Sequence, residues 1–151
     1  MTTERLLSGS GRTVVRAPRE AVWAALLDPA VLVRLIPAAR TVERLDEVTY
    51  CATLGLGVGP LHSEYRVQLQ LANVDGPRSV ELAGESKGGL GGGDARGYVT
   101  LTERGGGTVL AWRFEGAVHG AISRVGGPVL RFATRLFVAR FFAELGRLAA
   151  G

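Results

Sequence analysis

Cysteine is nearly absent from this chain, with Cys51 the single example among 151 residues. An internal disulfide is therefore impossible, which excludes the disulfide-stapled secreted domains and fits a reducing compartment. Long hydrophobic runs are absent too, since no stretch approaches the roughly 18 apolar residues of a membrane-spanning helix. The opening residues, Met1–Arg5, also lack the apolar core of a signal peptide. We therefore expect a cytoplasmic protein.

Histidine is scarce as well, with His62 and His119 as the two examples. A metal site needs three or four converging ligands, and two histidines with one cysteine and no spacing signature do not supply them. The glycines of residues 88–93 lack the third glycine of the dinucleotide-binding motif, and no Gly-Lys-Ser or Gly-Lys-Thr follows them. These absences predict no metal site and no nucleotide site.

Net charge is missing from the first 120 residues, where 13 basic residues balance 13 acidic ones. The formal net charge of +4 belongs to residues 121–151, which hold five arginines against the single acid Glu144. The same segment carries four of the five phenylalanines. This distribution gives no reason to expect nucleic acid as a partner. A terminal segment that is both apolar and basic suits an anionic membrane surface or the lid of an apolar pocket.

The hydrophobic pattern predicts one folded domain over residues 1–151, with a strand at 10–16 and a helix from Arg19 to Leu27. Asp28-Pro29 ends that helix and starts a second short one, which Pro37 closes. Further along the chain the apolar residues alternate, which is typical of strands joined by short turns. Six more strands are predicted, at residues 40–46, 48–58, 62–74, 79–86, 95–104 and 107–118.

A long helix is predicted over residues 123–148, with Gly127-Pro128 delaying or kinking its start. This order favours an α+β fold, in which a seven-stranded antiparallel sheet curls around the last helix and two short helices follow the first strand. Several inward positions of the sheet carry small residues, namely Ala52, Gly84 and Gly116. Small residues opposite a long helix leave space, so an apolar cavity between sheet and helix is the expected ligand site.

Five motifs make the chain similar to a known family. The segment Ala17–Leu26, followed by Asp28-Pro29, resembles the opening of the START-like, polyketide-cyclase-type helix-grip superfamily. Leu35-Ile36-Pro37, Gly57-Val58-Gly59-Pro60 and Gly84–Gly89 narrow the resemblance to the CoxG family, the G-type accessory proteins of carbon monoxide dehydrogenase. The resemblance covers nearly the whole chain.

This resemblance implies a helix-grip fold without cofactor-based catalysis of its own. Members of the family accompany molybdenum hydroxylases of the aerobic carbon monoxide dehydrogenase type. They are tied to recruiting that enzyme to the inner face of the cytoplasmic membrane and to its link with the quinone pool. The resemblance therefore predicts a non-enzymatic protein, peripheral to the cytoplasmic membrane, with no tightly bound cofactor. Its expected ligand is a quinone, menaquinone in first place, or a lipid.

The chain departs from the family pattern at several places. Leu61–Glu64 stands where members often have a small, basic, glycine-containing stretch, and Gly91–Asp94 is richer in glycine than usual. Members often continue into a variable tail that reaches the membrane, whereas this sequence stops at Gly151. Either a tail has been removed or the last helix takes over its role. The glycines of 88–93 are expected to form a surface loop or a flexible lid, from which Leu90 dips into the cavity mouth.

Mostly apolar residues of the inward sheet face and the last helix are expected to line the cavity. Tyr65 and Thr134 are expected to hydrogen-bond a carbonyl oxygen of the ligand. Trp112 and Phe114 are expected either to stack on a flat quinone ring or to fill the core. The predicted ligand-binding residues are Leu35, Leu56, Val58, Tyr65, Leu90, Trp112, Phe114, Leu130, Thr134 and Phe137.

Two apolar stripes run along the terminal helix. The family pattern favours the first as the side against the sheet, and it consists of Leu130, Ala133, Phe137, Phe141, Leu145 and Leu148. The second consists of Val125, Val129, Phe132, Leu136, Ala139 and Ala143. Its partner is open: the N-terminal helices or a second copy, a membrane surface, or a partner enzyme. For the membrane, the predicted contact residues are Arg131, Arg135, Phe132 and Leu136.

Two other functions stay open. Helix-grip enzymes of the cyclase type use a cavity acid, histidine or tyrosine as general acid or base, and His62, Glu64 and Tyr65 form a cluster of that kind. The first alternative is therefore a small-molecule cyclase or lyase that uses these residues. The second is an adaptor with a filled core and no ligand.

Overall fold

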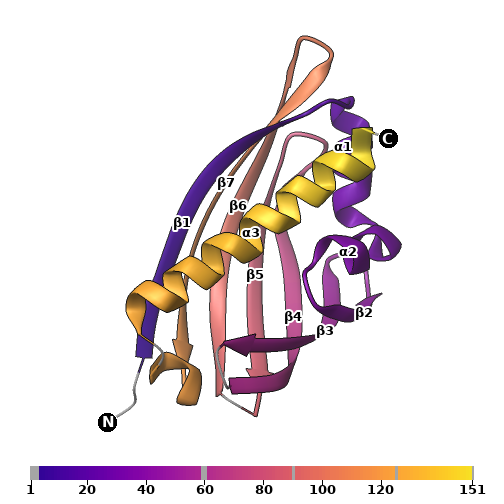
Figure 1. The fold of residues 1–151 in the computed structure, drawn as a ribbon. Helices are drawn as coiled ribbons and strands as arrows, with labels where there is room; N and C mark the ends of the chain where they lie inside the picture. The colour runs from indigo at the N-terminus through magenta and orange to yellow at the C-terminus, as the bar shows by residue number, and fades with distance from the viewer. Residues whose placement is uncertain (1–3, 59–60, 90, 125, 151) are drawn as a thin grey trace.

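The computed structural model describes residues 4–58, 61–89, 91–124 and 126–150, with the side chains of 56–58, 61–63, 122 and 150 left aside. Two short helices follow the first strand, and one long helix follows the last (Figure 1). The elements are β1 (Glu4–Val15), α1 (Arg19–Leu27), α2 (Pro29–Leu35), β2 (Ala39–Arg44), β3 (Thr49–Val58), β4 (Leu61–Asp75), β5 (Ser79–Gly88), β6 (Gly91–Arg104), β7 (Gly107–His119), the 3₁₀ turn η1 (Ala121–Arg124) and α3 (Gly127–Ala150).

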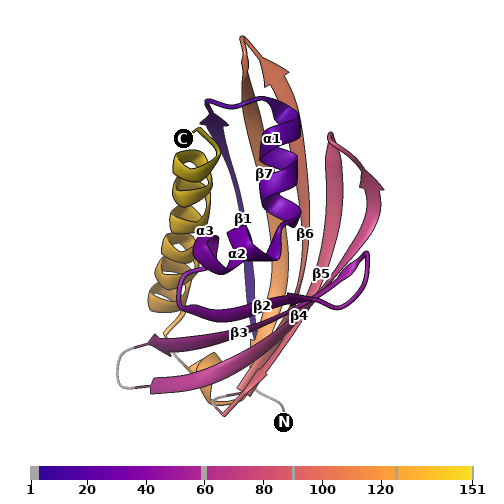
Figure 2. The same ribbon diagram turned by 90° about the vertical axis from the view of Figure 1, so that its right-hand side faces the viewer.

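The strands form one antiparallel sheet of seven in the order β1-β7-β6-β5-β4-β3-β2. The sheet is curved, and α3 crosses its concave side diagonally, from the N-terminal end of β1 towards α1 (Figures 1 and 2). The helices α1 and α2 contact α3 on this same side. The predicted α+β fold, a seven-stranded sheet curled around a long last helix, is confirmed.

Two strands begin earlier than the sequence pattern predicts. β1 starts at Glu4, because residues 4–9 pair with Phe114–His119 of β7. β6 starts at Gly91, so the glycine stretch belongs to the sheet, and the expected lid at Gly91–Gly93 is wrong. The reason is close packing: a Cβ placed on Gly93 would lie 2.7 Å from the carbonyl oxygen of Ala117 on the neighbouring strand. Leu90 lies outside the described residues.

The long helix starts at Gly127 rather than at residue 123, after the separate turn η1. Pro128 occupies its first turn, where a missing N–H costs no intrahelical hydrogen bond. The predicted delay at Gly127-Pro128 is therefore confirmed.

The two stripes of α3 have different surroundings. Leu130 and Leu145 of the first stripe are buried, and Phe142 beside it joins the same core as Leu35 and Leu110. The described residues of the second stripe are exposed, with Phe132 at 68% of its full accessible surface. The possibility that this second stripe packs on the N-terminal helices is therefore wrong, because α1 and α2 contact the opposite side of the helix.

A pair of leucine variants on α3 tests this orientation. Leu145→Ala empties a fully buried position (0% exposed) and is expected to lower the free energy of unfolding by about 2–5 kcal/mol. Leu136→Ala, on the exposed side, is expected to change it by less than about 0.5 kcal/mol. Urea denaturation of the two variants measures the difference. Equal effects at both positions would contradict the orientation of the helix.

Candidate functional site

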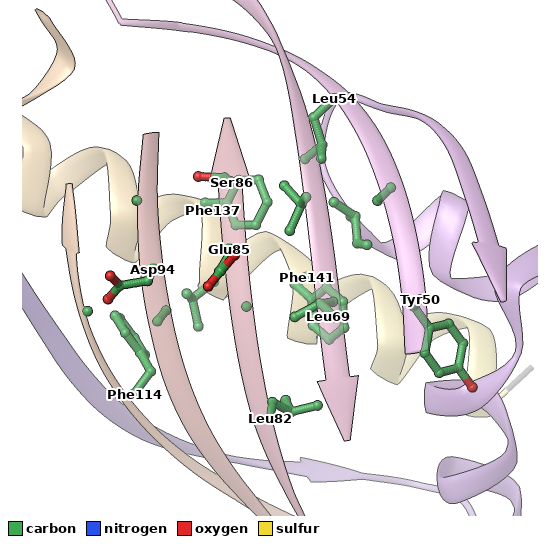
Figure 3. A pocket seen from close by; sticks show the side chains of 18 of the residues that line it. Tyr50, Leu54, Leu69, Leu82, Glu85, Ser86, Asp94, Phe114, Phe137 and Phe141 are labelled. Atoms are coloured by element: carbon green, nitrogen blue, oxygen red, sulfur yellow. The ribbon is translucent and has the colours of Figure 1, made fainter. Parts of the chain in front are cut away.

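A cavity of about 530 Å³ lies between the concave face of the sheet and α3 and is open to solvent along part of its boundary. Its wall consists mainly of apolar side chains from β3 to β7, the three helices and β1 (Figure 3). These include Leu7, Leu26, Leu32, Leu54, Val67, Leu69, Leu71, Leu82, Val99, Phe114, Phe137, Val138 and Phe141.

The space arises from a row of small residues across the sheet. Strand pairing places Gly84 opposite Ala95, and Ala95 opposite Gly116, in one line beneath α3. Leu69 and Leu7 stand at the two ends of this line. The strand and helix backbones are held apart by the larger residues around them, so this row leaves a hollow instead of a filled core. Two of its three members, Gly84 and Gly116, were predicted as inward small residues.

Tyr65 carries an unpaired hydroxyl at the cavity wall. Its side chain is 4% exposed, and the hydroxyl has no hydrogen-bond partner among the described residues. The ring lies flat against Gly88 of β5, since a Cβ placed there would stand 2.7 Å from Tyr65 Cδ1. Burial raises the pKa of the Tyr65 phenol above its usual value of 10.0, so the group is a neutral O–H donor at physiological pH. The site thus offers one desolvated donor to a ligand.

Two other hydroxyls at the wall are already used. Tyr50 O–H donates to the carbonyl oxygen of Leu27, at 2.7 Å. Thr134 O–H donates to the carbonyl oxygen of Leu130 one turn back along α3, at 2.8 Å. Back-bonding of this kind is common for threonine inside helices. The prediction that Thr134 donates to a ligand carbonyl is therefore wrong for this arrangement, whereas Tyr65 keeps its proton available.

The predicted wall residues fall into three groups. Tyr65, Phe114, Thr134 and Phe137 line the cavity. Leu35 and Leu130 are instead packed in the core, at 1% and 5% exposure, and do not reach the wall. The side chains of Leu56 and Val58, and all of Leu90, lie outside the described residues. Whether the lining residues contact a ligand stays a prediction.

Trp112 stacks on a neighbouring residue and does not line this cavity. Its indole lies against the ring of Phe142, with centroids 3.9 Å apart and planes at 17°. Phe141 meets Phe142 edge to face, with centroids 5.0 Å apart. Of the two expectations for Trp112, core packing therefore holds in the structure. Phe141 and Phe142, which the sequence analysis did not assign to the cavity, line it.

The cluster proposed for acid–base chemistry is divided by the sheet. Tyr65 points to the cavity, whereas Glu64 is exposed on the other face and forms an ion pair with Arg40 at 2.9 Å. Neighbouring residues of a strand face opposite sides, which makes this separation unavoidable. The side chain of His62 lies outside the described residues. Glu64 therefore cannot assist Tyr65 inside the cavity.

Charge around the cavity is one-sided. Glu85, Ser86 and Asp94 also border it, and the described part of the wall contains no arginine, lysine or histidine. Glu85 on β5 pairs directly with Asp94 on β6. These three residues were missed by the sequence analysis. Their signal was the absence of large inward side chains beside them, which brings the strand backbone itself to the cavity.

The outer side of α3 is apolar and basic at once. Val129, Phe132 and Leu136 are 54%, 68% and 41% exposed, and Arg131 and Arg135 are exposed between them. These five residues are called the outer α3 surface below. The predicted membrane-contact residues all belong to it, so the structure brings them together on one face; contact with a membrane stays a prediction.

The family model for CoxG, the G-type component of carbon monoxide dehydrogenase, matches residues 11–149. The chain belongs to this family. Its fold is shared by a conserved protein from Geobacillus kaustophilus, which is 26% identical over 95% of each chain with a TM-score of 0.89. No functionally curated protein is significantly similar in sequence to this CoxG family member.

Two more distant structures share only the helix-grip fold with this CoxG family member. The Zhui aromatase/cyclase from Streptomyces sp. R1128 is 14% identical, with 96% of this chain and 94% of the cyclase covered and a TM-score of 0.70. Ara h 8.0201 is 12% identical, with 96% of this chain and 98% of the other chain covered and a TM-score of 0.64.

Two further properties of this family member bear on its function. Among the residues that the structure describes, no group of three or more His, Cys, Asp or Glu is placed to hold a metal ion. Within the same residues, no helix has the length and apolar character needed to cross a membrane.

Phenylalanine variants of the two cavity tyrosines test the unpaired hydroxyl. Tyr65→Phe removes a buried donor without a partner and is expected to raise the free energy of unfolding of ligand-free protein by about 1 kcal/mol. Tyr50→Phe deletes a made hydrogen bond and is expected to lower it by about 1–3 kcal/mol. Urea denaturation of delipidated protein measures both. A loss of stability in Tyr65→Phe equal to that in Tyr50→Phe would show that the Tyr65 hydroxyl has a partner.

Proposed function

We propose that this protein is a carrier for an apolar ligand that bears a carbonyl group, with a quinone, menaquinone in first place, as the ligand. The observation that supports the proposal is the combination of an apolar cavity with the buried, unpaired hydroxyl of Tyr65. A buried donor without a partner is unfavourable, and a ligand carbonyl oxygen relieves that cost.

The cavity fits such a ligand by volume and by chemistry. Its volume of about 530 Å³ lies within the range of small-molecule sites, which is about 300–1,000 Å³. Phe114, Phe137 and Phe141 offer aromatic surfaces to a flat ring, and Tyr65 offers the donor. Because the cavity is partly open, an isoprenoid tail longer than the cavity can extend outward. A bound quinone would supply electron-accepting chemistry, while the protein binds, orients and shields the ring.

The family supplies the partner in this proposal. Its name describes a component of carbon monoxide dehydrogenase, which supports an accessory, non-catalytic protein that recruits an enzyme of that molybdenum-containing type. The separation of Glu64 from Tyr65 gives no support to the cyclase or lyase alternative. In the proposed role, the carrier connects the enzyme with the quinone pool of the cytoplasmic membrane.

The outer α3 surface is the proposed site of membrane contact. Exposed Phe132 and Leu136 can enter the interface of a bilayer, while Arg131 and Arg135 reach anionic head groups. The protein would then be peripheral to the inner face of the cytoplasmic membrane. In this arrangement one side of α3 closes the cavity and the other side contacts the membrane from which the ligand comes.

Mass spectrometry of a lipid extract from purified protein tests the carrier function. Protein expressed in a menaquinone-producing bacterium is expected to retain an isoprenoid quinone near stoichiometric amount. Ala52→Phe places a large side chain into the cavity from a position that is 3% exposed, and is expected to abolish this recovery. Ala83→Phe, the same change on the exposed outer face, is the matched control. Wild-type protein that yields no quinone or other neutral carbonyl lipid would refute the carrier function.

Charge reversal on α3 tests the membrane contact. Arg131→Glu with Arg135→Glu is expected to weaken binding to vesicles containing phosphatidylglycerol by about thirtyfold or more, because each arginine near an anionic surface contributes about 1 kcal/mol. Arg96→Glu with Arg104→Glu changes the net charge equally on exposed positions of β6 and serves as control. Vesicle co-sedimentation measures both. Equal weakening by the two pairs would leave no specific role for the outer α3 surface.

A further inference from the structure

We infer that the cavity selects ligands with an uncharged head group and discriminates against carboxylates and phosphates. This inference rests on the proposed carrier function and narrows its ligand class. It separates neutral carbonyl compounds, such as quinones or amides, from the free fatty acids and anionic phospholipids that an apolar cavity could otherwise hold.

The first argument is the absence of a counter-charge at the wall. None of the described lining residues is basic, and the free donor is the single hydroxyl of Tyr65. A carboxylate moved from water into an apolar site needs several donors or a cation to offset its lost hydration. One neutral hydroxyl satisfies a carbonyl oxygen but not an ionised carboxylate.

The second argument is the presence of negative charge next to the cavity. Glu85 and Asp94 lie on adjacent strands, directly paired, and both border the cavity (Figure 3). Their neighbours along the strands include Gly84, Gly93 and Ala95, which have little or no side chain. The wall here is therefore little more than the strand backbone, and an anionic head group would approach two carboxylates that are nearly at the cavity surface.

The nearest basic side chains are placed elsewhere. Arg5 donates to the carbonyl oxygen of Ser123 at 3.1 Å and, like Arg131, lies beside Gly127 at the start of α3. Arg40 is paired with Glu64 on the outer face, and Lys87 is exposed. None of these four basic residues lines the cavity. The basic charge of the protein thus lies on its surface, whereas the cavity presents acidic and neutral groups.

A matched pair of probes tests the inference: myristic acid and its primary amide, myristamide, which share one chain and differ in head-group charge. Titration into delipidated protein, followed by tryptophan fluorescence, gives the two Kd values, and a short-tailed menaquinone is titrated in parallel. At pH 7 the amide is expected to bind about a hundredfold or more tightly than the acid, because pH 7 lies well above the pKa of an ordinary carboxyl group. Between pH 5 and pH 8 the affinity for the acid is expected to fall about tenfold per pH unit, while that for the amide stays constant.

Variants assign the selectivity to named groups. Glu85→Gln with Asp94→Asn is expected to raise the affinity for the acid about threefold per carboxylate removed, as for a charge acting through a largely aqueous path, without changing that for the amide. Glu103→Gln with Glu115→Gln removes the same charge at exposed positions that do not line the cavity, and is expected to change neither. An unchanged affinity of the Glu85/Asp94 variant for the acid would refute the role of these two carboxylates.

The outcomes separate the inference from the function on which it rests. Menaquinone and amide that bind while the acid does not, or binds with the stated pH dependence, support the inference. Acid and amide that bind equally at pH 7 overturn it and leave the carrier function standing. Failure of menaquinone, amide and acid alike to bind refutes the carrier function itself.

Discussion

The packing of α3 against a sheet face that it cannot fill is the constraint on which the other features depend. Towards its C-terminal end, Phe142 and Leu145 of α3 join a closed core with Leu35 and Leu110. This core fixes how far the helix stands from the sheet. Beside it the facing row of the sheet is glycine and alanine, so the same separation leaves a cavity of about 530 Å³. Protein interiors are normally close-packed, and an unfilled volume of this size is a cost that a ligand offsets.

The two sides of α3 give the helix two chemically different roles. The inner side meets a cavity whose described wall has no basic residue and whose free donor is the buried hydroxyl of Tyr65. The outer side carries Phe132 and Leu136 between arginines. A single element thereby keeps an uncharged ligand site apart from a basic surface by the thickness of one helix. In the proposed function this places the ligand next to the membrane without exposing the cavity to its anionic head groups.

The order and type of the elements could be predicted because they follow from local patterns, and Gly84 and Gly116 were enough to predict a cavity. The start of β1 was missed because Gly9 and Gly11 weaken the strand pattern; they are glycines because Phe114 and Trp112 fill the space of their side chains. Leu130 and Trp112 were placed on the wall although they pack in the core. That distinction depends on the local distance between helix and sheet, which no spacing in the sequence encodes. Glu85 and Asp94 were missed because strand alternation assigns them to the outer face.

The crystal structure of a complex with a short-tailed menaquinone tests the central claim most directly. The account predicts the ring inside the cavity, with a quinone carbonyl oxygen about 2.5–3.0 Å from Oη of Tyr65, the range of an ordinary O–H···O hydrogen bond. A ring bound outside the cavity, or inside it with Tyr65 Oη still unpaired, would contradict the account.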